Sequence, residues 1–125
     1  MKVEPNKSAP EDSQQFDAAN LSGMNPAEAK EYIFNFIATL KLTEKQIQNT
    51  GEEMEKWQSR IELAKSKGQD DLALEAQKEL GRITEKKQQL TAEAEGLKSQ
   101  IDEMRRQLPL LAAKERSIDP DLLEQ

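Results

Sequence analysis

The residues of this sequence that could do chemistry are clustered carboxylates. Groups of this kind can hold a divalent cation or act as an acid and base pair. Three clusters stand out: Glu52, Glu53 and Glu55; Asp70 and Asp71; and Asp102 and Glu103. The chain has neither histidine nor cysteine, so it lacks the usual base near neutral pH, the commonest zinc ligand and a thiolate nucleophile. Because lysine or arginine lies close to each cluster, we expect solvated helix faces, with no enzyme activity, metal site or cofactor.

The composition predicts a thin helical protein. Of the 125 residues, 35% are hydrophobic, 34% are charged and only 4% are aromatic, which is too little for a thick globular core. The 18 basic and 24 acidic residues give a net charge of −6, so nucleic acid is not an expected partner. The sequence starts without an apolar leader and has no stretch long enough to span a bilayer. We therefore expect a cytoplasmic protein.

A heptad repeat is the strongest structural signal. With Ile33 at position a, apolar residues recur at a and d through two long segments separated by residues 65–71. Most of the residues between Pro26 and Leu108 are good helix formers. The repeat predicts a core formed by Ile33, Phe36, Leu40, Ile47, Met54, Trp57, Ile61, Leu80, Ile83, Leu90, Leu97, Ile101 and Met104.

The two segments match each other when the chain is folded at Gly68. Ten pairs that join an a position to a d position, among them Trp57 with Leu80, have sequence numbers that sum to 137. A constant sum is what an antiparallel hairpin requires of facing core residues. The weakest layer pairs Thr50 with Lys87, and a bend in the helix there is an open alternative.

These patterns predict an all-α fold, a long antiparallel two-helix coiled-coil hairpin over residues 26–108 with its tip at 66–71. Asn25 and Pro26 predict the start of the first helix. Residues 1–25 are rich in proline and polar residues and are expected to form a disordered tail. Pro109 is expected to kink or end the second helix, so that residues 109–125 form a short helix or a tail.

Some apolar residues lie outside the repeat, at the end of the hairpin away from the tip. Either residues 110–123 fold back over them, or they form the surface of an oligomer or partner complex. We favour the oligomer, because a two-helix core is small for its length. The candidate surface comprises Phe34, Ile37, Leu42, Leu110 and Leu111.

The tip resembles that of the PspA family, the group of phage shock protein A and the vesicle-inducing protein of plastids. The matching positions keep the family's order and spacing, and Asn25-Pro26 is similar to the Asp-Pro before that family's first long helix. The tip motif consists of Trp57, Ala64, Gly68, Asp71, Leu72, Ala73 and Ala76, with Glu62 also matching.

The resemblance implies a non-enzymatic scaffold that polymerises in an ESCRT-III-like manner at the cytoplasmic membrane surface and takes part in the envelope stress response. The family's amphipathic membrane helix has no counterpart in residues 1–25, so direct membrane binding is not expected. We expect a short, divergent member that binds copies of itself or a longer helical homologue and reaches the membrane through a partner.

A second hypothesis places function at the acidic tip. Hairpins that enter the channel of a polymerase carry carboxylates such as Asp70 and Asp71 at their tip, and chaperone or adaptor hairpins also act there. The same two residues are explained by the dipole of the second helix. Charge reversal at both positions separates the alternatives.

Overall fold

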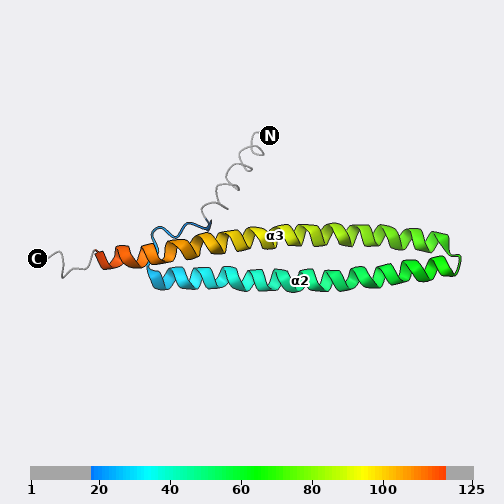
Figure 1. The fold of residues 1–125 in the computed structure, drawn as a ribbon, viewed down its shortest axis with the longest axis horizontal. Helices are drawn as coiled ribbons and strands as arrows, with labels where there is room; N and C mark the ends of the chain where they lie inside the picture. Colours follow the sequence, from blue (N-terminus) through cyan, green and yellow to red (C-terminus); the bar gives the residue numbers. More distant parts are fainter. Residues whose placement is uncertain (1–17, 118–125) are drawn as a thin grey trace, which may run out of the picture. The chain divides into compact units, whose positions relative to one another are not determined.

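The computed structural model describes residues 18–117 and contains two helices in that range (Figure 1). Helix α2 spans Pro26–Ser66 and helix α3 spans Asp70–Ser117, and no strand occurs among the described residues. The prediction of an all-α helical hairpin is confirmed. Neither helix, within the described range, has an apolar stretch long enough to cross a membrane.

Helix α2 begins with a reciprocal cap. The backbone amide of Glu28 donates to Asn25 Oδ1 at 2.8 Å, and the backbone amide of Asn25 donates to Glu28 Oε1 at 3.1 Å. This capping box satisfies two amides, and Pro26 at the first helical position has no amide hydrogen to satisfy. The sequence therefore specifies the first residue of α2 locally.

The tip is a tight turn that depends on glycine. The amide of Gln69 donates to the carbonyl of Ala64 at 2.8 Å, and the amide of Gly68 donates to Lys65 at 3.0 Å. These two bonds form a Schellman motif, and Gly68 has the left-handed φ of +70° that the motif requires. The carbonyl of Gln69 then accepts the first bond of α3 from Ala73 at 3.0 Å.

The buried side chains of the two helices lie on the predicted seam. Every buried residue of α2 and α3 occupies an a or d position, and the remaining seam residues through Leu111 are half-buried. The buried set comprises Ala29, Ile33, Thr43, Thr50, Ile61, Ala64, Ala73, Ala76, Ile83, Leu90, Ala94, Ile101 and Met104. The larger core residues Phe36, Leu40, Ile47, Met54, Trp57, Leu80 and Leu97 are half-buried.

The weakest predicted layer does not interrupt α2. Thr50 is buried, and its hydroxyl donates to the carbonyl of Gln46 at 2.7 Å within the continuous helix. A Cβ added at Gly51 would lie 3.7 Å from Lys87 Nζ, so these two residues approach each other as the pairing predicts. The stem of Lys87 can cover the seam while its ammonium group reaches water.

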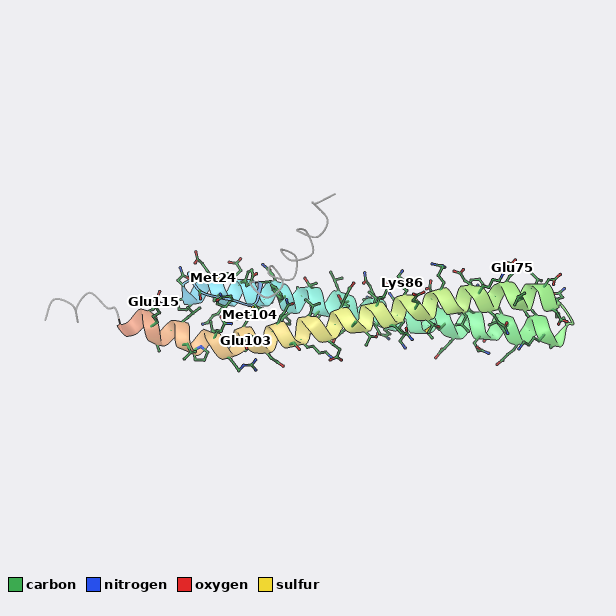
Figure 2. All side chains as sticks on the ribbon, turned by 90° about the horizontal axis from the view of Figure 1, so that it is seen from above. Met24, Glu75, Lys86, Glu103, Met104 and Glu115 are labelled. Atoms are coloured by element: carbon green, nitrogen blue, oxygen red, sulfur yellow. The ribbon has the colours of Figure 1, made fainter. Side chains whose placement is uncertain are left out.

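The chain divides into two compact units that are described separately. One unit contains residues 18–38 and 97–117, and the other contains residues 39–96 with the tip. In the first unit, Met104 of α3 is fully buried, and Figure 2 labels it together with Met24 of the same unit. In the tip unit, alanines and Ile61 form the buried seam next to the turn.

Two boundaries of the predicted hairpin differ from the structure. Helix α3 continues through Pro109 to Ser117 instead of ending at Leu108. Pro109 and Arg105, which lies one turn earlier, are both exposed, so water can reach the carbonyl that proline leaves unbonded. The helix can therefore continue through Pro109, because the proline lies on its solvent-exposed face.

The second difference concerns residues 18–25, which were expected to belong to a disordered tail. Leu21 is fully buried, and its amide donates to Gln107 Oε1 at 2.7 Å. Gln107 Nε2 in turn donates to the carbonyl of Ala19 at 2.7 Å. A single side chain of α3 thus satisfies two backbone groups of this segment, which allows Leu21 to be buried. Residues 1–17 of the predicted tail lie outside the described residues.

Candidate protein-binding groove at the hairpin tip

A groove runs along one flank of the seam in the tip unit. It has a volume of about 440 Å³ and is lined from both helices at d, g and c positions of the heptad. We call it the tip groove. Its lining consists of Trp57, Arg60, Leu63 and Ala64 of α2, the turn residues Lys67 and Gln69, and Leu72, Glu75, Ala76 and Glu79 of α3.

Two exposed leucines border the tip groove. Leu63 and Leu72 are each 56% exposed although the seam beneath them, at Ala64 and Ala76, is buried. Leu74, which is 53% exposed, adds a third large apolar side chain to the tip. A coiled coil needs only its a and d positions to be apolar, so the hairpin itself does not explain leucine at these places.

Trp57 contributes an aromatic face to the groove. The side chain is half-buried, and the guanidinium carbon of Arg60 lies 4.4 Å from the centre of its ring. Such a cation–π contact orients the exposed arginine over the tryptophan. Aromatic and arginine side chains side by side on a surface are typical of the residues that dominate protein–protein binding.

The two edges of the tip groove carry opposite charge. Arg60 and Lys67 lie on the α2 edge, whereas Glu75 and Glu79 lie on the α3 edge. Glu79 forms an ion pair with Arg82 of its own helix. The hydrogen bond from Arg82 holds the pKa of Glu79 below its ordinary value, so the ionised form of this carboxylate is favoured.

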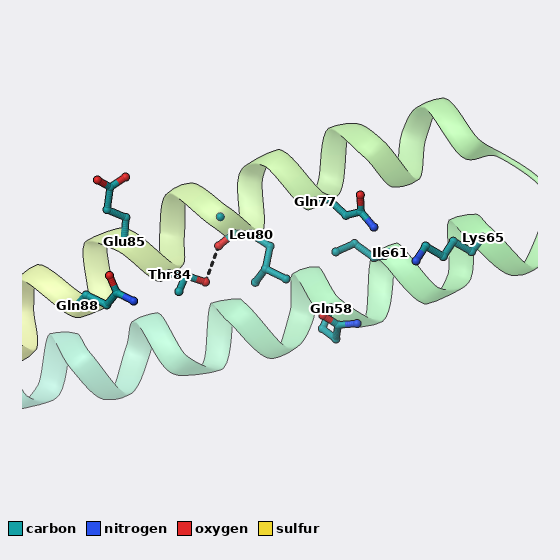
Figure 3. A pocket seen from close by; sticks show the side chains of 9 residues that line it. Gln58, Ile61, Lys65, Gln77, Leu80, Thr84, Glu85 and Gln88 are labelled. Carbon is teal, nitrogen blue, oxygen red and sulfur yellow. Dashed lines mark hydrogen bonds between the residues drawn. The ribbon is translucent and has the colours of Figure 1, made fainter.

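The opposite flank of the seam is polar. A groove of about 610 Å³ lies there, lined mainly at e, a and b positions, with glutamines along it (Figure 3). The hydroxyl of Thr84 donates to the carbonyl of Leu80 at 2.7 Å and so bonds its own helix rather than facing the groove as a free donor. Exposed leucine is absent from this lining, so the chemistry of the two flanks differs clearly.

The structure brings four of the seven tip-motif residues into the tip groove, namely Trp57, Ala64, Leu72 and Ala76. Ala73 is buried in the seam, and Gly68 makes the turn. Asp71 is exposed in the first turn of α3, where a carboxylate is favourable at the positive end of the helix dipole. Some residues of the motif are therefore needed to form the turn, the seam and the start of α3, and the others line the tip groove.

The acidic clusters do not come together to form a metal-binding site among the described residues. Within residues 18–117, no three carboxylates lie close enough to hold a metal ion. Asp70 and Asp71 follow Gln69, which occupies the cap position of α3. Glu103 instead binds Arg106 at 2.6 Å, and this hydrogen bond, together with a weaker one from Gln107, lowers the pKa of Glu103.

The five residues of the candidate oligomer surface, expected at the end of the hairpin away from the tip, are spread over both units. Phe34 is 65% exposed and Leu110 is 70% exposed, whereas Ile37 and Leu111 are half-buried. Leu42 is exposed but belongs to the tip unit. Residues 110–117 continue α3 and do not fold back, and residues 118–123 lie outside the described range. Residues 18–25 pack at this end instead.

Comparison with known proteins places the chain in a family. Residues 23–121 match the family described as Conserved hypothetical protein CHP04376. The chain belongs to this family. No curated protein and no solved structure matches it significantly.

Sequence reasoning did not identify Leu63, Arg60 or Gln107. Leu63 and Arg60 stand at c and g positions, outside the a and d positions of the predicted core. Leucine at c of one helix and at g of the next was a usable signal. Gln107 carried no local signal, because its partners Ala19 and Leu21 are more than 80 residues away.

Proposed function

We propose that this protein is a non-enzymatic helical scaffold that acts by binding protein, either copies of itself or a helical partner. The observation that carries the proposal is the pair of exposed leucines, Leu63 and Leu72, beside a groove that contains Trp57 and Arg60. Contiguous apolar surface of this kind, bordered by charge, marks contact sites on soluble proteins.

The proposal includes a PspA-like role. The tip motif supports it, since Trp57, Ala64, Leu72 and Ala76 all line the tip groove. On this basis the protein would belong to a cytoplasmic system that supports the envelope under stress, and it would reach the membrane surface through a partner. The tip groove offers the contact surface that such a scaffold requires.

Site-specific photo-crosslinking in the source cells tests the proposal. A photoreactive amino acid replaces Leu63 in one variant and Leu72 in another, and Gln89, which is exposed on α3 outside the groove lining, serves as the matched control. We expect both groove positions to give a discrete protein adduct that the control position does not give.

Identification of the adduct by mass spectrometry then separates self-association from a different protein partner. Equal labelling at Leu63, Leu72 and Gln89, or no adduct at either leucine, would contradict a protein-binding groove. Charge reversal of Asp70 and Asp71 in the same experiment tests the acidic-tip alternative, which requires loss of the adduct while helicity is retained.

A further inference from the structure

The tip groove is self-complementary in charge. Its α2 edge carries Arg60 and Lys67, and its α3 edge carries Glu75 and Glu79. Among the described residues, no ion pair joins these two edges within the chain, and Glu79 pairs with Arg82 of its own helix. Glu75 is exposed and projects from the helix near the tip (Figure 2). When two copies of such a surface face each other, the basic edge of each copy can pair with the acidic edge of the other.

Two-fold symmetry allows two face-to-face arrangements of the tip unit. If the symmetry axis runs along the helices, the tips point the same way and α2 of one copy faces α3 of the other. If the axis runs across the helices, the tips point in opposite directions and α2 faces α2. The second arrangement places Arg60 and Lys67 against the same residues of the partner copy, which like charges oppose. Charge therefore selects the parallel arrangement.

The hairpin pairing also places the apolar residues correctly for the parallel arrangement. Facing positions have sequence numbers that sum to 137, so Arg60 lies at the level of residue 77, between Glu75 and Glu79. Leu63 lies at the level of residue 74, which is two residues from Leu72 on α3. At a rise of 1.5 Å per residue, the two leucines are offset by about 3 Å along the helix axis. Each leucine of one copy thus meets the other leucine of the second copy, next to the charged pairs.

We propose that a second copy of this chain docks on the tip groove in a parallel, two-fold arrangement. Leu63 packs against the second copy's Leu72, and Arg60 pairs with its Glu75 and Glu79. This inference rests on the proposed protein-binding function and names its partner. The apolar contact supplies affinity, and the charged edges set the orientation.

Complementary charge reversal tests the pairing between copies. In a two-fold dimer, the contact between residue 60 of one copy and residue 75 of the other occurs twice. Arg60→Glu and Glu75→Arg each make both of these contacts repulsive, so we expect each variant to dimerise at least about tenfold more weakly than the wild type. Mixing the two variants restores both opposite-charge pairs, so a heterodimer should form with nearly wild-type affinity. Native mass spectrometry distinguishes the species because the variants differ in mass.

Matched controls are available on exposed positions outside the groove lining. Lys78→Glu and Glu62→Arg make the same charge changes and should leave dimerisation unchanged. Failure of the mixed variants to form a heterodimer, or wild-type affinity of Arg60→Glu alone, would overturn the proposal. A wild-type chain that stays monomeric at all concentrations would overturn it as well, whereas photo-crosslinking to a different protein would still support the proposed function.

Cysteine cross-linking reports the orientation independently, since the chain has no cysteine of its own. A mixture of Leu63→Cys and Leu72→Cys chains should form a heterologous disulfide. A disulfide between two Leu63→Cys chains, more efficient than in the mixture, would show α2 against α2 and overturn the parallel arrangement.

Discussion

At the scale of single residues, side chains outside the heptad pattern account for what is particular to this protein. Leucine at positions 63 and 72 is not needed by the seam and creates the tip groove. Gln107 holds residues 18–25 against the helices at the other end of the chain. Both features depend on contacts that a repeat of period seven does not encode.

Replacing Gln107 should release the segment that contains Leu21. Gln107→Met keeps a side chain of similar length but removes the hydrogen bonds to Ala19 and Leu21. We expect exchange of the Leu21 amide to accelerate by roughly tenfold or more, since a hydrogen bond contributes on the order of 1 kcal/mol. Hydrogen exchange followed by NMR measures it.

The exposed Gln89→Met variant is the control, and it should leave the amide of Leu21 protected. Unchanged protection of Leu21 in Gln107→Met would show that burial alone holds the segment.

Glu103 should make the stability of the protein depend on pH. Its folded pKa lies below the ordinary value, chiefly because of the hydrogen bond from Arg106, so the ionised form is favoured in the folded state. The stabilisation is therefore present above the unfolded pKa and is lost as the pH falls through the folded pKa. The melting temperature of wild type should exceed that of Glu103→Gln at pH 7, and the difference should shrink as the pH falls below the ordinary pKa of glutamate.

Because Glu103 lies at the surface, the effect is expected to be small. A melting-temperature difference that grows as the pH falls would contradict the assignment, since that sign requires a raised pKa.

At the scale of elements, most of the fold could be predicted because its signals are local or periodic. The heptad repeat located both helices and their buried faces, and Gly68 located the turn. The prediction was less accurate at the ends, because Pro109 lies on an exposed face where α3 tolerates it. The burial of Leu21 depends on Gln107 of α3, which is far away in the sequence, so no local pattern predicts it.

The two glycines Gly68 and Gly81 should respond to alanine in opposite ways. Gly68 has a φ of +70°, so Gly68→Ala should destabilise the hairpin by about 1 kcal/mol. Gly81 lies inside α3, and nothing would contact an added Cβ, so Gly81→Ala should stabilise it by about 0.8 kcal/mol. Urea denaturation followed by circular dichroism measures both, and stabilisation by Gly68→Ala would contradict the Schellman turn.

The layer of Thr50 and Lys87 should be improved by an apolar residue. Lys87 occupies a half-buried a position beside Gly51. Lys87→Leu should raise the free energy of unfolding by about 1 kcal/mol, because the added apolar surface is removed from water at the seam. Lys86→Leu, at an exposed position next to it, should have little effect. Equal effects of the two changes would contradict the assigned seam.

At the scale of the whole molecule, a two-helix seam leaves the protein with little core for its length. Alanines and threonines make up much of the buried set, and most of the larger seam residues are only half-buried. Proteins with such thin cores commonly gain stability by association. The fold was predictable from the sequence, whereas the tip groove was not, because Leu63 and Arg60 lie at c and g positions outside the predicted seam.

We propose above that this protein acts through contacts made by its tip groove. The most direct test is the absolute mass by light scattering over a range of concentrations, for the wild type and for the double variant Leu63→Ser and Leu72→Ser. Leu42→Ser, which removes an exposed leucine outside the groove lining, is the matched control. We predict a concentration-dependent dimer for the wild type and Leu42→Ser, and a monomer of unchanged helicity for the double variant. A double variant that associates as strongly as the wild type would contradict the account.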